Sequence, residues 1–148
     1  MYDGDKNAMT YRKACRDAEA GQTLSALAQL EAALKISDNT AWYPLYAFCI
    51  AKERGHVKRA YELCRIAMDA DPHNPMHYYY LARVHLVAKS PSQAIAALES
   101  GVLAGGCPEI AALLNQLGTR KPLVFKKLKR DNPLNKYAGL ILARLRLR

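Results

Sequence analysis

The stretch GHVKRAYELCRIAMDADP, residues 55–72, sets the pattern for most of this chain. Its apolar residues recur at spacings of three and four: Val57, Ala60, Leu63, Cys64, Ala67 and Met68. This spacing predicts an α-helix with one apolar stripe. Gly55 suits the left-handed turn that ends a preceding helix, and Pro72 closes the stretch because proline cannot continue a helix.

The same pattern recurs 34 residues before this stretch and 34 residues after it. The positions of Gly55, Ala60, Cys64, Ala67 and Pro72 are taken upstream by Gly21, Ala26, Leu30, Ala33 and Asp38, and downstream by Lys89, Ala94, Leu98, Gly101 and Gly106. A fixed period with small residues at fixed places predicts a solenoid of helix–turn–helix repeats. Small residues on the stripe let two helix axes approach to about 8–10 Å.

The pattern resembles the tetratricopeptide repeat (TPR) over residues 7–117, most closely over residues 55–106. In residues 75–88, the side chains of Tyr78, Leu81, Ala82 and His85 stand where this family places an aromatic residue, a leucine, a small residue and a second aromatic residue. The resemblance implies an all-α superhelix of about three helix–turn–helix repeats. We expect a repeat domain over residues 1–119, with an apolar helix over residues 108–117 covering its last face.

The helix boundaries are predicted from local signals. Asn74 is expected to cap a helix that starts at Pro75, and Ser90–Gln93 is expected to form a capping box. Pro44 and Phe48 depart from the family pattern, which suggests an altered register in their helix. Residues 1–6 are expected to be frayed, and helices are expected at about residues 8–20, 22–36, 41–54, 57–70, 75–88, 91–104 and 108–117, with Gly118 as the last C-cap.

The net charge of +9 comes from one end of the chain. Residues 1–119 hold 12 Lys/Arg and 12 Asp/Glu, whereas residues 120–148 hold 10 Lys/Arg and a single acidic residue, Asp131. Such a basic segment either solubilises the chain or attracts nucleic acid, anionic lipid or an acidic protein surface. The candidate polyanion contacts are Lys126, Lys127, Lys129, Arg130, Arg144, Arg146 and Arg148.

After a basic linker, an amphipathic helix is predicted from about Pro133 to the end of the chain. Residues 130–137 resemble the closing segment of some small bacterial TPR proteins. The apolar side of this helix needs a cover, which could be its own repeats, a second copy of the chain, a partner or an anionic membrane surface. Its apolar residues are Leu134, Tyr137, Ala138, Ile141, Leu142 and Leu145.

Several function classes find no support in the sequence. No apolar run approaches the roughly 18–20 residues that span a bilayer, and residues 1–10 are too polar for a signal peptide, so a cytoplasmic location is expected. Cys15 and Cys49 stand 34 residues apart, too distant on stacked helices for a disulfide. We expect reduced structural thiols, with a redox or metal role as the alternative.

No catalytic motif, phosphate loop or metal-binding His pair is present. We therefore expect no enzymatic activity, no cofactor and no bound metal. The run Tyr78–Tyr80 is no stacking platform, because three consecutive helical residues point in three directions. Tyr78 is expected in the core and Tyr79 on the binding surface.

The resemblance implies that the concave face, formed by the first helix of each pair, binds a peptide or helix of a partner protein. A lysine–asparagine clamp for a terminal carboxylate is not expected, because Tyr11, Cys15 and Cys49 stand at those positions. The resulting hypothesis is a non-enzymatic adaptor with an unidentified protein partner; nucleic-acid binding and self-association remain alternatives. The predicted site residues are Tyr11, Cys15, Trp42, Leu45, Cys49, Met76, Tyr79 and Arg83, with Glu19, Lys52 and Leu86 also on this face.

Overall fold

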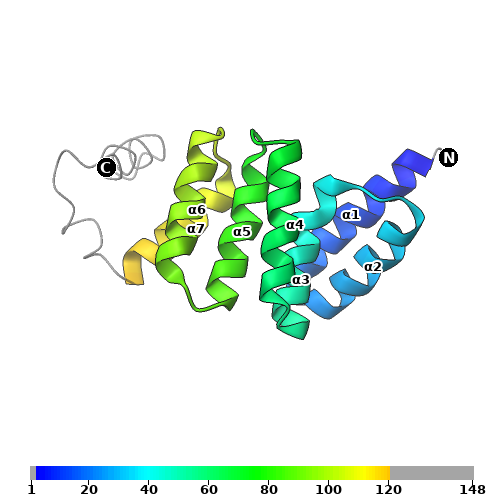
Figure 1. Ribbon diagram of the computed structural model, residues 1–148, viewed down its shortest axis with the longest axis horizontal. Coiled ribbons are helices and arrows are strands. Elements are labelled where there is room, and N and C mark those ends of the chain that lie inside the picture. The colour runs from blue at the N-terminus through cyan, green and yellow to red at the C-terminus, as the bar shows by residue number, and fades with distance from the viewer. Residues whose placement is uncertain (1–2, 121–148) are drawn as a thin grey trace.

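The computed structural model describes residues 3–120 and confirms an all-α repeat architecture. Three consecutive helix pairs and a single last helix follow one another along the long axis of the molecule (Figure 1). The pairs are α1 (Asp3–Glu19) with α2 (Thr23–Ile36), α3 (Tyr43–Arg54) with α4 (Val57–Ala70), and α5 (Pro75–Val87) with α6 (Pro91–Leu103). A short 3₁₀ helix, η1 (Thr40–Trp42), precedes α3, and α7 (Pro108–Arg120) follows the third pair.

The 34-residue period is visible in the core. Ala26, Ala60 and Ala94 occupy equivalent places on α2, α4 and α6, and all three are fully buried. The next equivalent set, Leu30, Cys64 and Leu98, is fully buried as well. Small and medium side chains at these positions allow each second helix to pack closely against its neighbours.

The turn inside each pair also repeats. Gly21 and Gly55 adopt left-handed backbone, with φ of 83° and 70°. Lys89 takes the equivalent place in the third pair and adopts the same conformation, with φ of 59°. Lysine carries a Cβ that makes this region unfavourable, so the third pair keeps the turn at a steric cost.

The predicted helix start at Asn74 is confirmed, and a second start has the same kind of cap. Asn74 Oδ1 accepts a hydrogen bond from the Met76 amide at 3.1 Å, and Pro75 is the first residue of α5. Asn39 Oδ1 likewise accepts from the Ala41 amide at 3.0 Å, at the start of η1. These side chains satisfy amide donors that have no partner within the helix.

Other boundaries were predicted wrongly. α1 begins at Asp3 rather than near Ala8, with acidic side chains in its first turn, where they suit the helix dipole. Ser90 makes no capping hydrogen bond, so the predicted capping box is absent, although Pro91 does start α6. Gly118 continues α7 instead of ending it, because its backbone is not left-handed.

The tyrosine run was also assigned wrongly in part. Tyr80 is the fully buried member of the run, and Tyr79 is nearly as buried. Tyr78 is half-buried, and its hydroxyl donates to the Pro72 carbonyl oxygen at 3.0 Å. The direction of each ring depends on which neighbouring helix covers it, and that neighbour lies outside the local sequence.

Candidate functional site

The first helices of the pairs, together with η1, carry all the predicted protein-binding residues, and the structure divides them by burial. Leu45 and Cys49 are fully buried on α3, and Trp42 and Tyr79 are only 7% and 6% exposed. The half-buried members form what we call the first-helix surface: Tyr11, Cys15, Met76 and Arg83, with exposed Glu19 and Lys52 beside them.

One end of this surface is aromatic. The ring of Tyr11 on α1 stacks on that of Trp42 in η1, with centroids 5.7 Å apart and an interplanar angle of 12°. Stacked aromatic rings form a rigid, largely apolar platform. Burial, followed by the neighbouring Cys15, raises the pKa of the Tyr11 hydroxyl, so this hydroxyl stays neutral at physiological pH.

The thiols near this platform are poor nucleophiles. Burial raises the pKa of Cys15, although contacts with Tyr80 and Tyr11 oppose the shift. Burial also raises the pKa of Cys49 to about 12. A thiol must ionise to react, so both are expected to act as packing groups.

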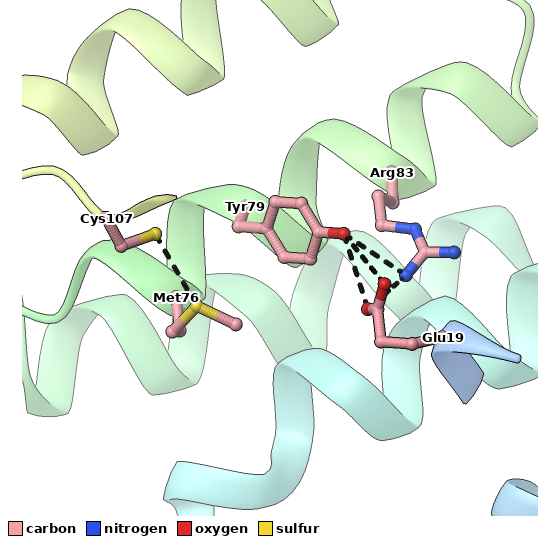
Figure 2. Close-up of polar contacts among 5 residues, drawn as sticks. All are labelled: Glu19, Met76, Tyr79, Arg83 and Cys107. Atoms are coloured by element: carbon pink, nitrogen blue, oxygen red, sulfur yellow. Dashed lines mark hydrogen bonds and ion pairs between the residues drawn. The ribbon is translucent and has the colours of Figure 1, made fainter. Parts of the chain in front are cut away.

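At the other end, three polar side chains from α1 and α5 converge (Figure 2). Arg83 Nη1 lies 2.7 Å from Glu19 Oε1, and the Tyr79 hydroxyl lies 3.3 Å from each carboxylate oxygen of Glu19. Glu19 and Arg83 are 64 residues apart, so the contact joins the first helix pair to the third. The carboxylate of Glu19 thus receives donors from two side chains of α5.

The guanidinium of Arg83 is held from a second side. Its Cζ atom lies 4.0 Å from the ring centroid of Phe48 on α3, and Lys52 Nζ lies 5.9 Å from the same centroid. Cations over an aromatic face are attracted by its negative quadrupole. Phe48, noted in the sequence only as a departure from the family pattern, therefore helps to place the two cations.

A sulfur contact lies on the side of Tyr79 away from Arg83, as Figure 2 also shows. The Cys107 thiol, just before α7, donates to Met76 Sδ at 3.6 Å. Met76 is half-buried, and its flexible thioether adapts to differently shaped apolar neighbours. The first-helix surface therefore combines an aromatic platform, an adaptable methionine and an arginine.

A pocket of about 320 Å³ lies elsewhere, between α2, α3 and α4. Leu34, Leu63, Tyr43 and Tyr46 contribute apolar surface to it. None of the predicted site residues lines this pocket; its remaining lining residues are Glu31, Lys35, Asp38 and Arg59.

Two further searches covered the described residues. No three His, Cys, Asp or Glu side chains between residues 3 and 120 gather in a way that would hold a metal ion. None of the helices in this range combines the length and apolar character needed to cross a membrane. The predictions for the basic segment and the last amphipathic helix, residues 121–148, lie outside the described part of the chain.

Comparison with known families agrees with the resemblance to the tetratricopeptide repeat. A tetratricopeptide repeat family model matches residues 51–117, from the end of α3 to α7. Residues 51–117 are therefore similar to tetratricopeptide repeats. Comparisons with curated proteins and with solved structures returned no match. TPR repeats are in general protein–protein interaction modules, and the resemblance read from the sequence is confirmed for this segment.

Proposed function

We propose that this TPR protein binds a segment of a partner protein, as a peptide or helix, on the first-helix surface. The observation that carries the proposal is the mixture of half-buried side chains on this surface. Tyr11 and Met76 offer apolar area, and Arg83 offers a charge already seated on an aromatic ring. Aromatic residues, methionine and arginine are the residue types enriched where protein interfaces bind most strongly.

The buried predicted residues act in this proposal as the support of the surface. Leu45 and Cys49 have no exposed area, so they hold α3 in place and leave contact with a partner to their neighbours. Tyr79 contributes its hydroxyl group to the Glu19 cluster, while its ring is buried. The anchors reduce to Tyr11, Met76 and Arg83, with the edge of Trp42 beneath Tyr11.

Site-specific photo-crosslinking tests the proposal. A photoreactive phenylalanine analogue replaces Met76 on the first-helix surface or, as a control, Ile66, a 38% exposed apolar residue on α4. In nuclease-treated lysate, we expect a discrete protein adduct from position 76 that is missing from position 66. Equal adducts from both positions, or none from position 76, would remove the first-helix surface as the binding site.

The charge of residues 120–148 favours a second candidate, binding of a nucleic acid or another polyanion. The sequence of this segment contains ten lysine and arginine residues and a single acidic residue, whereas residues 1–119 have no net charge. Binding by such a segment releases counterions, so the affinity of the full chain for a single-stranded oligonucleotide would fall steeply as salt is added. A flat salt response would eliminate this candidate.

A further inference from the structure

The geometry points to Glu19 as an internal competitor that occupies the position of a partner's acidic side chain on Arg83 and Tyr79. The inference rests on the proposed function and adds the chemistry of the partner: a segment whose carboxylate exchanges with that of Glu19. The observation behind the inference is that the carboxylate of Glu19, on α1, accepts hydrogen bonds from Tyr79 and Arg83, both on α5.

The receptor for the carboxylate is built independently of Glu19. Arg83 stacks on Phe48 at 4.0 Å, and its side chain is only 19% exposed. Tyr79 extends from a buried ring one helical turn earlier on the same helix. Both donors are therefore fixed by packing before any carboxylate arrives, which lowers the entropic cost of binding one.

Glu19, in contrast, is loosely held. It is the last residue of α1, and its side chain is 47% exposed. An ion pair with this exposure contributes little stability, because water solvates the separated charges well. Replacing Glu19 by another carboxylate therefore costs little and leaves Arg83 paired.

The charge around the receptor favours an acidic incoming group over a basic one. Lys52 lies on the same Phe48 ring as Arg83, and within residues 3–120 it makes no ion pair. Once Glu19 leaves, two cations face the incoming side chain. Glu53, which follows Lys52 on α3, does not neutralise these cations in an ion pair but accepts a hydrogen bond from Thr23 of α2.

The test uses the full chain and two capped ten-residue peptides. One peptide contains glutamate, alanine and leucine, and its twin carries glutamine at every glutamate. Binding is followed by NMR titration of backbone amides and of the Arg83 Nε–H group. The variants are Glu19→Gln and, as a control of equal charge change, Glu31→Gln, which breaks a 2.6 Å pair with Arg54 on other helices.

We expect Glu19→Gln to bind the glutamate peptide about 1.5- to 5-fold more tightly than Glu31→Gln, since an exposed competing pair is removed. Adding Arg83→Gln should cancel this gain and weaken binding about tenfold, because a charge-assisted hydrogen bond is lost. The glutamine peptide should not distinguish the two single variants.

Three results would overturn the inference: equal affinities of Glu19→Gln and Glu31→Gln, an equal gain for the glutamine peptide, or shifts that leave Arg83 and Tyr79 unmoved. The proposed function is judged separately, by crosslinking at Met76. A partner that crosslinks there while Glu19→Gln gains nothing would retain the surface and discard the exchange.

Discussion

The second helix pair, α3–α4, and the third, α5–α6, follow one 34-residue register but pack differently. In the second pair, Tyr43 and Tyr46 are half-buried and line the pocket against α2. Their register equivalents in the third pair, His77 and Tyr80, are buried. Helices with the same spacing along the chain thus leave a pocket beside α3 but bury the equivalent side chains of α5.

The second helices of these pairs, α4 and α6, also differ in how closely their neighbours approach them. Ala67 on α4 is fully buried with its methyl group accommodated, whereas its equivalent on α6 is Gly101. A Cβ at Gly101 would lie 2.6 Å from Ile110 Cδ1 and 2.9 Å from Tyr78 Cβ. A methyl group at position 101 would therefore require the side chain of Ile110 and the helix α5 to shift.

The largest expected effect on stability comes from adding a methyl group at Gly101. Gly101→Ala should lower the free energy of unfolding by about 1–3 kcal/mol, because Tyr78 Cβ cannot move without shifting α5. Urea unfolding of the full chain measures the change.

The matched variant, Ala67→Gly, should lose about 1 kcal/mol for a different reason, the lower helix propensity of glycine. If Gly101→Ala were as stable as the parent protein, the closer packing of the third pair would be refuted.

A smaller effect is expected at the turn inside the third pair. Lys89→Gly should raise the free energy of unfolding by about 0.5–1 kcal/mol, since glycine adopts φ of 59° without a Cβ clash. Thermal unfolding of the variant and its parent gives the sign directly.

The reverse change in the second pair, Gly55→Lys, should destabilise by a similar amount. Two changes of the same sign would mean that the turns are not equivalent, and the comparison of the pairs would lose its basis.

The smallest effect concerns His77. Burial lowers its pKa, while Asp71 and the nearby backbone of Ala67 oppose the shift, and neither ring nitrogen has a hydrogen-bond partner among the described residues. A histidine with a lowered folded pKa is neutral in the folded state and takes up a proton on unfolding. Its contribution to stability is therefore present above the ordinary histidine pKa of about 6.5 and declines as the pH falls toward the folded value.

The measurement is the slope of unfolding free energy against pH between about 7.5 and 5.5. His77→Leu should flatten this slope relative to the parent, whatever it does to absolute stability. His85, whose pKa burial also lowers, is retained in both proteins and cancels from the comparison. An unchanged slope would show that His77 is accessible to protons in the folded state.

Much of the architecture could be predicted from the sequence because its determinants are local or periodic. Ala26, Ala60 and Ala94 were placed on a buried stripe by the 34-residue period, and the structure buries them fully. Asn74 and Pro75 marked a helix start through chemistry confined to two residues. The errors at Ser90 and Gly118 also have local causes, since each residue permits a cap without requiring one.

The candidate surface was less predictable because its determinants are not local. α3 is covered by other helices, so its register could not show that Leu45 and Cys49 have no exposed area. The contact of Glu19 with Arg83 joins residues 64 positions apart, beyond the reach of any repeat pattern. Phe48 looked like an irregularity until the structure placed a guanidinium over its ring.

The same contact has a consequence for how the solenoid comes apart. In a repeat array whose units touch only adjacent units, an end pair unravels without affecting the pair two places away. Here Glu19 and Tyr79 meet across that distance, so detachment of α1 also removes a partner from α5. Because this exposed contact contributes little to stability, the coupling that it adds between the first and third pairs is small, but a chain of nearest neighbours would have no such coupling.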